Sequence, residues 1–156
     1  AAFEKSKALL WSSACHIQLL DYYYFSALTI MAAYDTVPQD RTEELATCVS
    51  QLKEWSENYP PTFHDKYALV SAEVARLEGR DVDAMRAYEE AILFARTAAF
   101  IQNEALACEL AARFYAKRGF AQIAEMYVRN ARSCYARWGA DGKVAPVEDR
   151  AAPGRL

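Results

Sequence analysis

The sequence predicts an all-α protein built as a right-handed stack of about seven antiparallel helices. Segments with the two-residue alternation of β-strands are almost absent from the 156 residues. The five glycines and five prolines nearly all fall between segments in which apolar residues recur every three or four positions. A pattern of small residues also occurs twice, about 40 residues apart, which is typical of a helical repeat.

The two copies of this pattern place alanines and one glycine at matching offsets. Small residues let two helices pack closely on either side of a tight turn. Repeats of roughly 34 residues with such a pattern form tetratricopeptide units, in which each helical pair packs on the next. We therefore expect a tetratricopeptide-like α-solenoid. The matched residues are Ala72, Gly79, Ala84 and Ala91 in the first copy and Ala112, Gly119, Ala124 and Ala131 in the second.

The N-terminal part predicts a short helix over residues 2–11 and a longer one over 14–34. Apolar residues of the longer helix follow the three-and-four spacing of a buried stripe. Val37 and Pro38 end it, because proline disfavours helical conformation in the residue before it. The stripe consists of Ile17, Leu20, Tyr24, Leu28 and Met31.

The next two helices are bounded by capping signals and prolines. Asp40 and Glu43 have the spacing of a capping box, which predicts that the third helix begins at Asp40. Residues 58–61 contain two prolines and end it. Thr62 is expected to cap a fourth helix that runs to about Glu78.

Glycine turns are expected to join the remaining helices. Gly79 stands where a helix end favours a left-handed residue, and Asp81 stands where the next helix favours an N-cap. Gly119 makes the equivalent turn in the second copy. The last three helices are predicted over residues 82–97, 102–118 and 121–138.

The domain organisation follows from these elements. Residues 1–142 are expected to form one helical repeat domain, and residues 143–156 a short helical turn and a C-terminal tail. Because the chain opens on helix-like sequence without a methionine, we expect it to be a piece of a longer protein.

Composition excludes several classes of protein. A net charge of −3 gives no overall footprint for nucleic acid, and no apolar run approaches the 18 residues of a membrane segment. The four cysteines form no paired motif and lie among apolar residues, so we interpret them as reduced, buried side chains of a cytoplasmic protein. They are Cys15, Cys48, Cys108 and Cys134.

No motif predicts catalysis, a cofactor or a metal site. The sequence contains no glycine-rich phosphate loop, nucleophile elbow or kinase signature. His16 and His64 are 48 residues apart and lack metal-ligand spacing. Acidic pairs such as Glu89 and Glu90 are adjacent, so a helix turns them in different directions. The chain is therefore predicted to be non-catalytic.

Three separated segments carry a more specific signal. They are residues 61–80, residues 103–115, and residues 134–140 followed by Lys143 and Val144. Together they resemble the helical region of very large multidomain signalling kinases, with the similarity covering roughly residues 20–149. In that family a kinase-like domain and an AAA-type ATPase precede the helical region, and a GAF domain and a histidine kinase follow it. The resemblance implies a connector or sensor region without its own enzymatic motifs.

The chain departs from that family at two positions. The family pattern reads Phe-x-His-Lys-Tyr, whereas here Asp65 occupies the histidine position and His64 stands one place early. Ser71 stands where glutamate is common. A contact between that histidine and glutamate, if the family has one, would be lost or altered in this chain.

The first helix of each pair in tetratricopeptide arrays lines a concave groove. Aligning the two copies at Gly79 and Gly119 identifies the positions that would face this groove. Charges of both signs there suit a peptide or a neighbouring domain, although exposed charges or salt bridges between repeats are the alternative. The candidate positions are Leu69, Glu73, Arg76, Leu77, Glu109, Arg113, Ala116 and Lys117.

The predicted function is a non-catalytic interaction and coupling module of a cytoplasmic sensor kinase. Its partner would be a neighbouring domain of the parent kinase, or another protein or peptide. Two alternatives remain open. One is a ligand-sensing domain that holds a small molecule among the aromatic residues 22–25 and the inner groove. The other is a free-standing adaptor that binds a partner's peptide.

Overall fold

The computed structural model describes residues 16–33 and 39–144, and every regular element in these ranges is helical. The all-α prediction is confirmed for this part of the chain. These ranges contain six long helices, and the other helix that was expected, over 2–11, lies outside the described residues. The elements are α2 (His16–Ala32), η1 (Gln39–Arg41), α3 (Thr42–Asn58), α4 (Pro60–Leu77), α5 (Asp81–Thr97), α6 (Ile101–Lys117), α7 (Ala121–Trp138) and α8 (Asp141–Val144).

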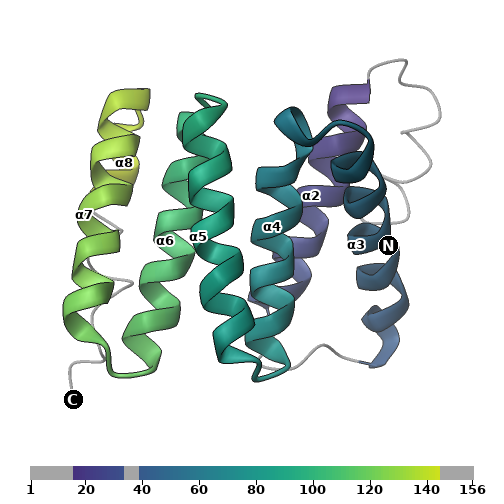
Figure 1. The fold of residues 1–156 in the computed structure, drawn as a ribbon, viewed down its shortest axis with the longest axis horizontal. Helices are drawn as coiled ribbons and strands as arrows, with labels where there is room; N and C mark the ends of the chain where they lie inside the picture. The colour runs from purple at the N-terminus through teal and green to yellow at the C-terminus, as the bar shows by residue number, and fades with distance from the viewer. Residues whose placement is uncertain (1–15, 34–38, 145–156) are drawn as a thin grey trace.

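The long helices stand side by side along the molecule (Figure 1). The connections α4–α5 and α6–α7 lie at one end of the molecule, and α5–α6 lies at the other. The pairs α4–α5 and α6–α7 pack most extensively, and α2 packs on both α3 and α4. None of the described helices has the length and apolar content that a membrane crossing requires.

The turns after α4, α5, α6 and α7 share one backbone geometry. Gly79, Gly119 and Gly139 have φ of 72°, 83° and 80°, which confirms the two glycine turns that were predicted. Ala99 has φ of 58° and makes the α5–α6 turn without a glycine. In each turn the next residue's N–H donates to a carbonyl five positions earlier, at 2.8–3.0 Å. This is the Schellman arrangement, and its left-handed residues are spaced 20 residues apart.

The predicted side-chain caps are wrong at three helix starts. Arg41 is the N-cap of α3, so Asp40 lies in η1 instead. The helix α4 begins at Pro60, two residues before Thr62, because proline fits the first turn, where no N–H bond is needed. Asp81 is the first residue of α5 rather than its cap, because the turn's closing residue, Arg80, takes that place.

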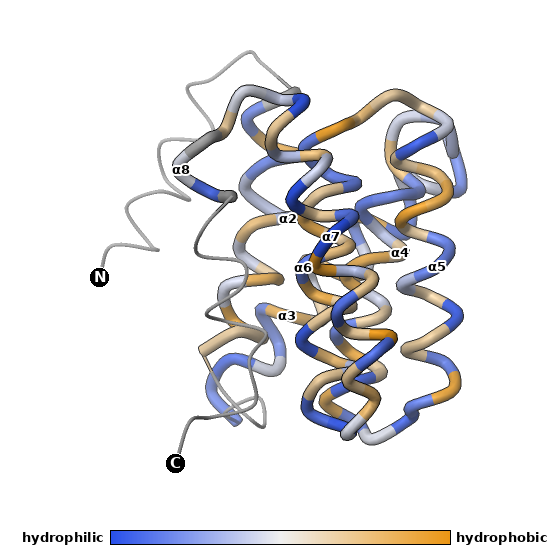
Figure 2. The backbone as a smooth tube through the Cα atoms, turned by 90° about the vertical axis from the view of Figure 1, so that its left-hand side faces the viewer, coloured by the Kyte–Doolittle hydropathy of each residue, from blue (hydrophilic) through white to orange (hydrophobic). Residues whose placement is uncertain are grey.

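Alanine stripes hold the helices close together. Ala72 and Ala112 are 0% and 1% exposed, as the repeat pattern predicted. Cys48, Cys108 and Cys134 are buried, and Cys15 lies outside the described residues. Viewed from the α7 end, hydrophilic and hydrophobic stretches alternate along the helices (Figure 2). The buried aliphatic, aromatic, cysteine and alanine side chains form one core cluster with members on every long helix from α2 to α7.

Candidate partner-binding groove

A small cavity opens where the last turn of α2 meets α4 and α6. Its volume is about 110 Å³. The helix α2 contributes backbone and apolar atoms, α4 contributes an acid and a base, and α6 contributes two bases and two apolar side chains. The lining residues are Met31, Ala32, Glu73, Arg76, Leu110, Arg113, Phe114 and Lys117.

Four of the predicted groove residues line this cavity, namely Glu73, Arg76, Arg113 and Lys117. The other four do not. Leu69 is buried in the core, Leu77 and Ala116 pack against the core, and Glu109 is buried behind Arg113. They do not line the cavity because the alignment of the two copies identifies the helix that carries each residue but not how deeply its side chain is buried.

Sequence reasoning missed the contribution of α2 and the apolar side chains of α6. Met31 was placed in a buried stripe, and the repeat pattern does not extend to α2 at all. Leu110 stands three residues before Arg113 on the same helix face, which is a signal that could have identified it. The cavity thus combines charged groups with an apolar wall.

A buried carboxylate on α4 orients the first arginine. Glu73 is 5% exposed and accepts a hydrogen bond from the hydroxyl of Tyr88 on α5. Arg76 donates to Glu73 from Nε at 2.9 Å and pairs with it through Nη2 at 2.8 Å. The same Nη2 donates to the carbonyl of Met31 at 3.4 Å, which ties α4 to the end of α2.

The same arrangement of a tyrosine hydroxyl, a buried glutamate and an arginine recurs in the next helical pair, α6–α7. Glu109 on α6 is 3% exposed and accepts a hydrogen bond from the hydroxyl of Tyr135 on α7 at 2.8 Å. Arg113, four residues after Glu109, donates to its other oxygen. Two Tyr–Glu–Arg triads therefore fix the two guanidinium groups that line the cavity.

Burial and charge keep each group in the state that this geometry needs. Burial raises the pKa of the Tyr88 phenol and Glu73 raises it further, so the hydroxyl stays protonated and donates. Burial alone would lower the pKa of Arg76, but the hydrogen bond to Glu73 outweighs it and raises that pKa. Burial alone would raise the pKa of Glu109, but Tyr135 and Arg113 hold it below the usual value.

The cavity has a surplus of positive charge and unused donors. Three positive charges minus the one negative charge of Glu73 leave +2 on the lining, and Glu109 behind it lowers this to +1. The Arg113 side chain is paired with Glu109 but is 32% exposed, so solvent reaches part of it. Lys117 is exposed, and no acidic side chain within residues 16–33 and 39–144 pairs with it. These features suit an anionic group.

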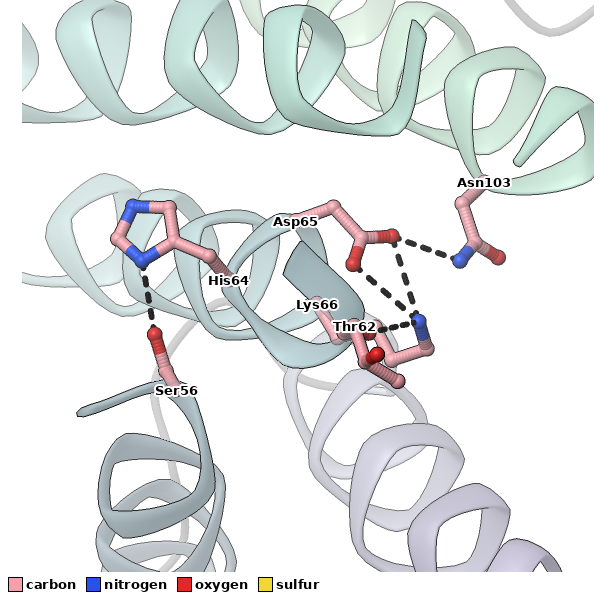
Figure 3. A network of polar contacts seen from close by, with 6 residues as sticks. All are labelled: Ser56, Thr62, His64, Asp65, Lys66 and Asn103. Carbon is pink, nitrogen blue, oxygen red and sulfur yellow. Dashed lines mark hydrogen bonds and ion pairs between the residues drawn. The ribbon is translucent and has the colours of Figure 1, made fainter. Parts of the chain in front are cut away.

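A second polar cluster fastens helices together and does not form a site. His64 Nδ1 lies 2.7 Å from the Ser56 hydroxyl on α3, and His64 Nε2 lies 2.7 Å from Glu90 on α5 (Figure 3 shows the Ser56 contact). His64 therefore links α4 to both of its sequence neighbours. No group of three or more metal-ligating side chains occurs in the described ranges.

Asp65 links α4 to α6. Its carboxylate is 3% exposed and accepts from Asn103 at 2.7 Å and from Lys66 at 3.2 Å (Figure 3). Lys66 also donates to the carbonyl of Thr62 at 3.0 Å and lies over the Phe100 ring. These groups satisfy one another, so the cluster has a structural role.

The aromatic residues 22–25 do not line the cavity. Tyr24 is 1% exposed and belongs to the core, and the Tyr23 ring packs on Trp55 with centroids 5.6 Å apart. Phe25 is half exposed. Their positions therefore match packing of α2 against α3 rather than a ligand pocket.

No protein-family model, curated protein or solved structure matches the chain. The resemblance to the helical region of multidomain signalling kinases therefore remains a prediction from the sequence.

Proposed function

We propose that this chain is a non-catalytic interaction and coupling module of a cytoplasmic multidomain sensor kinase. Its helices would form a right-handed, tetratricopeptide-like α-solenoid that docks a neighbouring domain. Support for the repeat architecture comes from the 20-residue spacing of the left-handed turns and the extensive packing within the pairs α4–α5 and α6–α7. Repeats of this kind bind partners along the surface that their first helices line.

One observation carries the assignment of the groove. Glu73 and Arg76 on α4 and Arg113 and Lys117 on α6, four of the predicted groove residues, line one cavity. Its arginines are held by buried glutamates, so little side-chain freedom remains to be lost when a partner binds. The volume of about 110 Å³ is far below the roughly 300–1,000 Å³ of pockets for drug-sized ligands. A side chain of a docking partner fits this cavity better than a free small molecule.

The test is docking of the polypeptide encoded on either side of this chain in its gene. Lys117→Glu reverses an exposed charge at the cavity without uncovering a buried partner, and we expect it to weaken capture in a pull-down. Arg137→Glu is the matched control, because both residues are basic side chains in the last turn of a helix and both are exposed.

We expect the Arg137→Glu protein to bind like the wild type and both variants to keep the wild-type melting temperature. The Lys117 effect should shrink with added salt, because charges at a rim are screened beyond about 8 Å at physiological ionic strength. Equal binding by the wild type and the Lys117 variant would remove the groove from the mechanism and leave the chain as a passive spacer.

A further inference from the structure

We propose that the groove holds the side-chain carboxylate of an aspartate or glutamate on the docking partner, with Arg113 and Lys117 as its ligands. This inference rests on the proposed function and adds the chemistry of the contact. It starts from two basic side chains of α6 that solvent reaches: Arg113, whose side chain is 32% exposed while its Nη2 is paired with Glu109, and Lys117, which is exposed.

The geometry of Arg113 selects a planar anion. Pairing with Glu109 uses one Nη group and fixes the guanidinium plane. A planar carboxylate can accept hydrogen bonds from two N–H groups of one guanidinium, which a single lysine cannot reproduce. The Tyr135 hydroxyl holds Glu109 in turn, so the donors of Arg113 have a set orientation before any partner arrives.

The charge balance selects a single negative charge. The lining and Glu109 together carry +1, which one carboxylate neutralises. A phosphate carries about two negative charges near neutral pH, and Glu73 already places a carboxylate in the lining. The second phosphate charge would therefore face Glu73 without a free cation to offset it.

The size and the apolar wall select a side chain rather than a chain terminus. Leu110 lies beside the basic groups and is partly exposed, so it can contact the methylene stem of an acidic side chain. A volume of about 110 Å³ holds one such stem and its carboxylate. A terminal residue would have to bring its backbone, its carboxylate and its side chain into the same space.

The experiment follows the Arg113 Nε–H resonance by NMR during titration of the folded chain. The probe is N-acetylglutamate N-methylamide, which presents only a side-chain carboxylate. Its glutamine analogue is the uncharged control, N-acetylalanine presents a terminal carboxylate, and inorganic phosphate presents the dianion. All titrations are run at one ionic strength with sodium chloride.

We expect a saturable shift with the glutamate probe and none with its glutamine analogue. Terminal carboxylate and phosphate should bind more weakly. Lys117→Gln should weaken the glutamate probe about threefold, as for an exposed charge. Arg113→Lys keeps a positive charge beside Glu109 but loses the paired N–H donors of the guanidinium group. It should weaken binding of the glutamate probe about tenfold, as for a charged hydrogen bond. Binding to this variant is followed through the Arg76 Nε–H resonance.

Several results would overturn the carboxylate assignment. They are an unsaturable response to the glutamate probe, equal binding of the glutamine analogue, or tighter binding of phosphate or the terminal carboxylate. If any of these results occurs while docking still depends on Lys117, the proposed function stands and only the carboxylate ligand is wrong. If the glutamate probe binds while docking ignores Lys117, the carboxylate site is real and the proposed docking function fails.

Discussion

A buried tyrosine hydroxyl without a partner distinguishes α2 from the other helices. Tyr24 is 1% exposed, and its hydroxyl has no hydrogen-bond partner in the described part of the chain. Burial raises the pKa of this phenol and the nearby charge of Asp65 adds to that shift, so the hydroxyl remains neutral. A buried polar atom without a partner loses its hydration and gains nothing in return.

We therefore expect Tyr24→Phe to leave the free energy of unfolding unchanged or to raise it by up to about 1 kcal/mol. Tyr88→Phe is the matched comparison, because it deletes a hydroxyl that Glu73 uses, and it should cost about 1–3 kcal/mol. Urea denaturation followed by circular dichroism measures both. A clear loss of stability in the Tyr24 variant would mean that its hydroxyl has a partner in solution.

Glu109 makes stability depend on pH on the acidic side. Its pKa in the folded chain lies below the ordinary value of 4.5, because Tyr135 and Arg113 outweigh the effect of burial. A lowered pKa stabilises the folded state above the ordinary value, and this contribution is lost as the pH falls through the folded-state value. The melting temperature should therefore fall below about pH 4.5.

Glu109→Gln should flatten this acidic slope, since glutamine does not titrate. The measurement is the melting temperature from pH 6 to pH 2.5 for both proteins. Glu57→Gln is the control, because Glu57 is exposed and its removal should leave the slope nearly intact. An unchanged slope in the Glu109 variant would contradict this role.

At the scale of the helix and its turn, one left-handed position is occupied by alanine instead of glycine. Ala99 has a positive φ of 58° in a turn of the same type as those at Gly79 and Gly119. A Cβ built at Gly79 or Gly119 meets nothing within 4 Å, so any cost of a side chain there is backbone strain alone. Alanine pays about 1–2 kcal/mol in this conformation.

We predict opposite effects from a pair of turn substitutions. Ala99→Gly should raise the free energy of unfolding by up to about 1 kcal/mol, because relief of strain exceeds the added freedom of the unfolded chain. Gly79→Val should lower it by about 1–2 kcal/mol. Gly142→Ala, where φ is not positive, is the control and should lack this penalty. A destabilised Ala99 variant would argue against strain in that turn.

How much of each helix the sequence predicts depends on the kind of signal. Apolar spacing and the glycines at 79 and 119 placed α5, α6 and α7 within one residue of their observed limits. The capping signal at Asp81 failed because the Schellman turn fixes the start of the following helix through its backbone, and the one at Thr62 failed because Pro60 begins the helix earlier. The α5–α6 turn gave no signal, because an alanine fills the left-handed position.

For the molecule as a whole, long-range polar contacts could not be predicted from spacing. Asn103 and Asp65 are 38 residues apart, and Tyr135 and Glu109 are 26 apart. Periodicity identifies which face of a helix is buried but not which buried charge finds which partner. The same limit explains why Glu73 and Arg113 line the cavity whereas Glu109 and Leu69, assigned to the same face, do not.

The Asp65 cluster should matter to the stability of the whole helical domain. Asp65→Ala would leave the buried Lys66 without its carboxylate and cut the link from α4 to α6. We expect a loss of about 3–5 kcal/mol, as for a broken buried ion pair. Lys53→Ala at an exposed pair should cost less than about 1 kcal/mol. Equal, small losses in urea denaturation would show that the cluster is dispensable.

The regular spacing of the turns has a consequence for how such a chain can change length. Successive turns fall at alternate ends of the molecule (Figure 1), and their left-handed residues lie at positions 79, 99, 119 and 139. Duplicating one 20-residue unit would send every later helix in the opposite direction. Duplicating two units, about 40 residues, would restore the direction and the buried face of every later helix. We therefore expect duplications or deletions within this gene to add or remove whole helical pairs. Changes of a single helix would reverse the later helices and would be selected against.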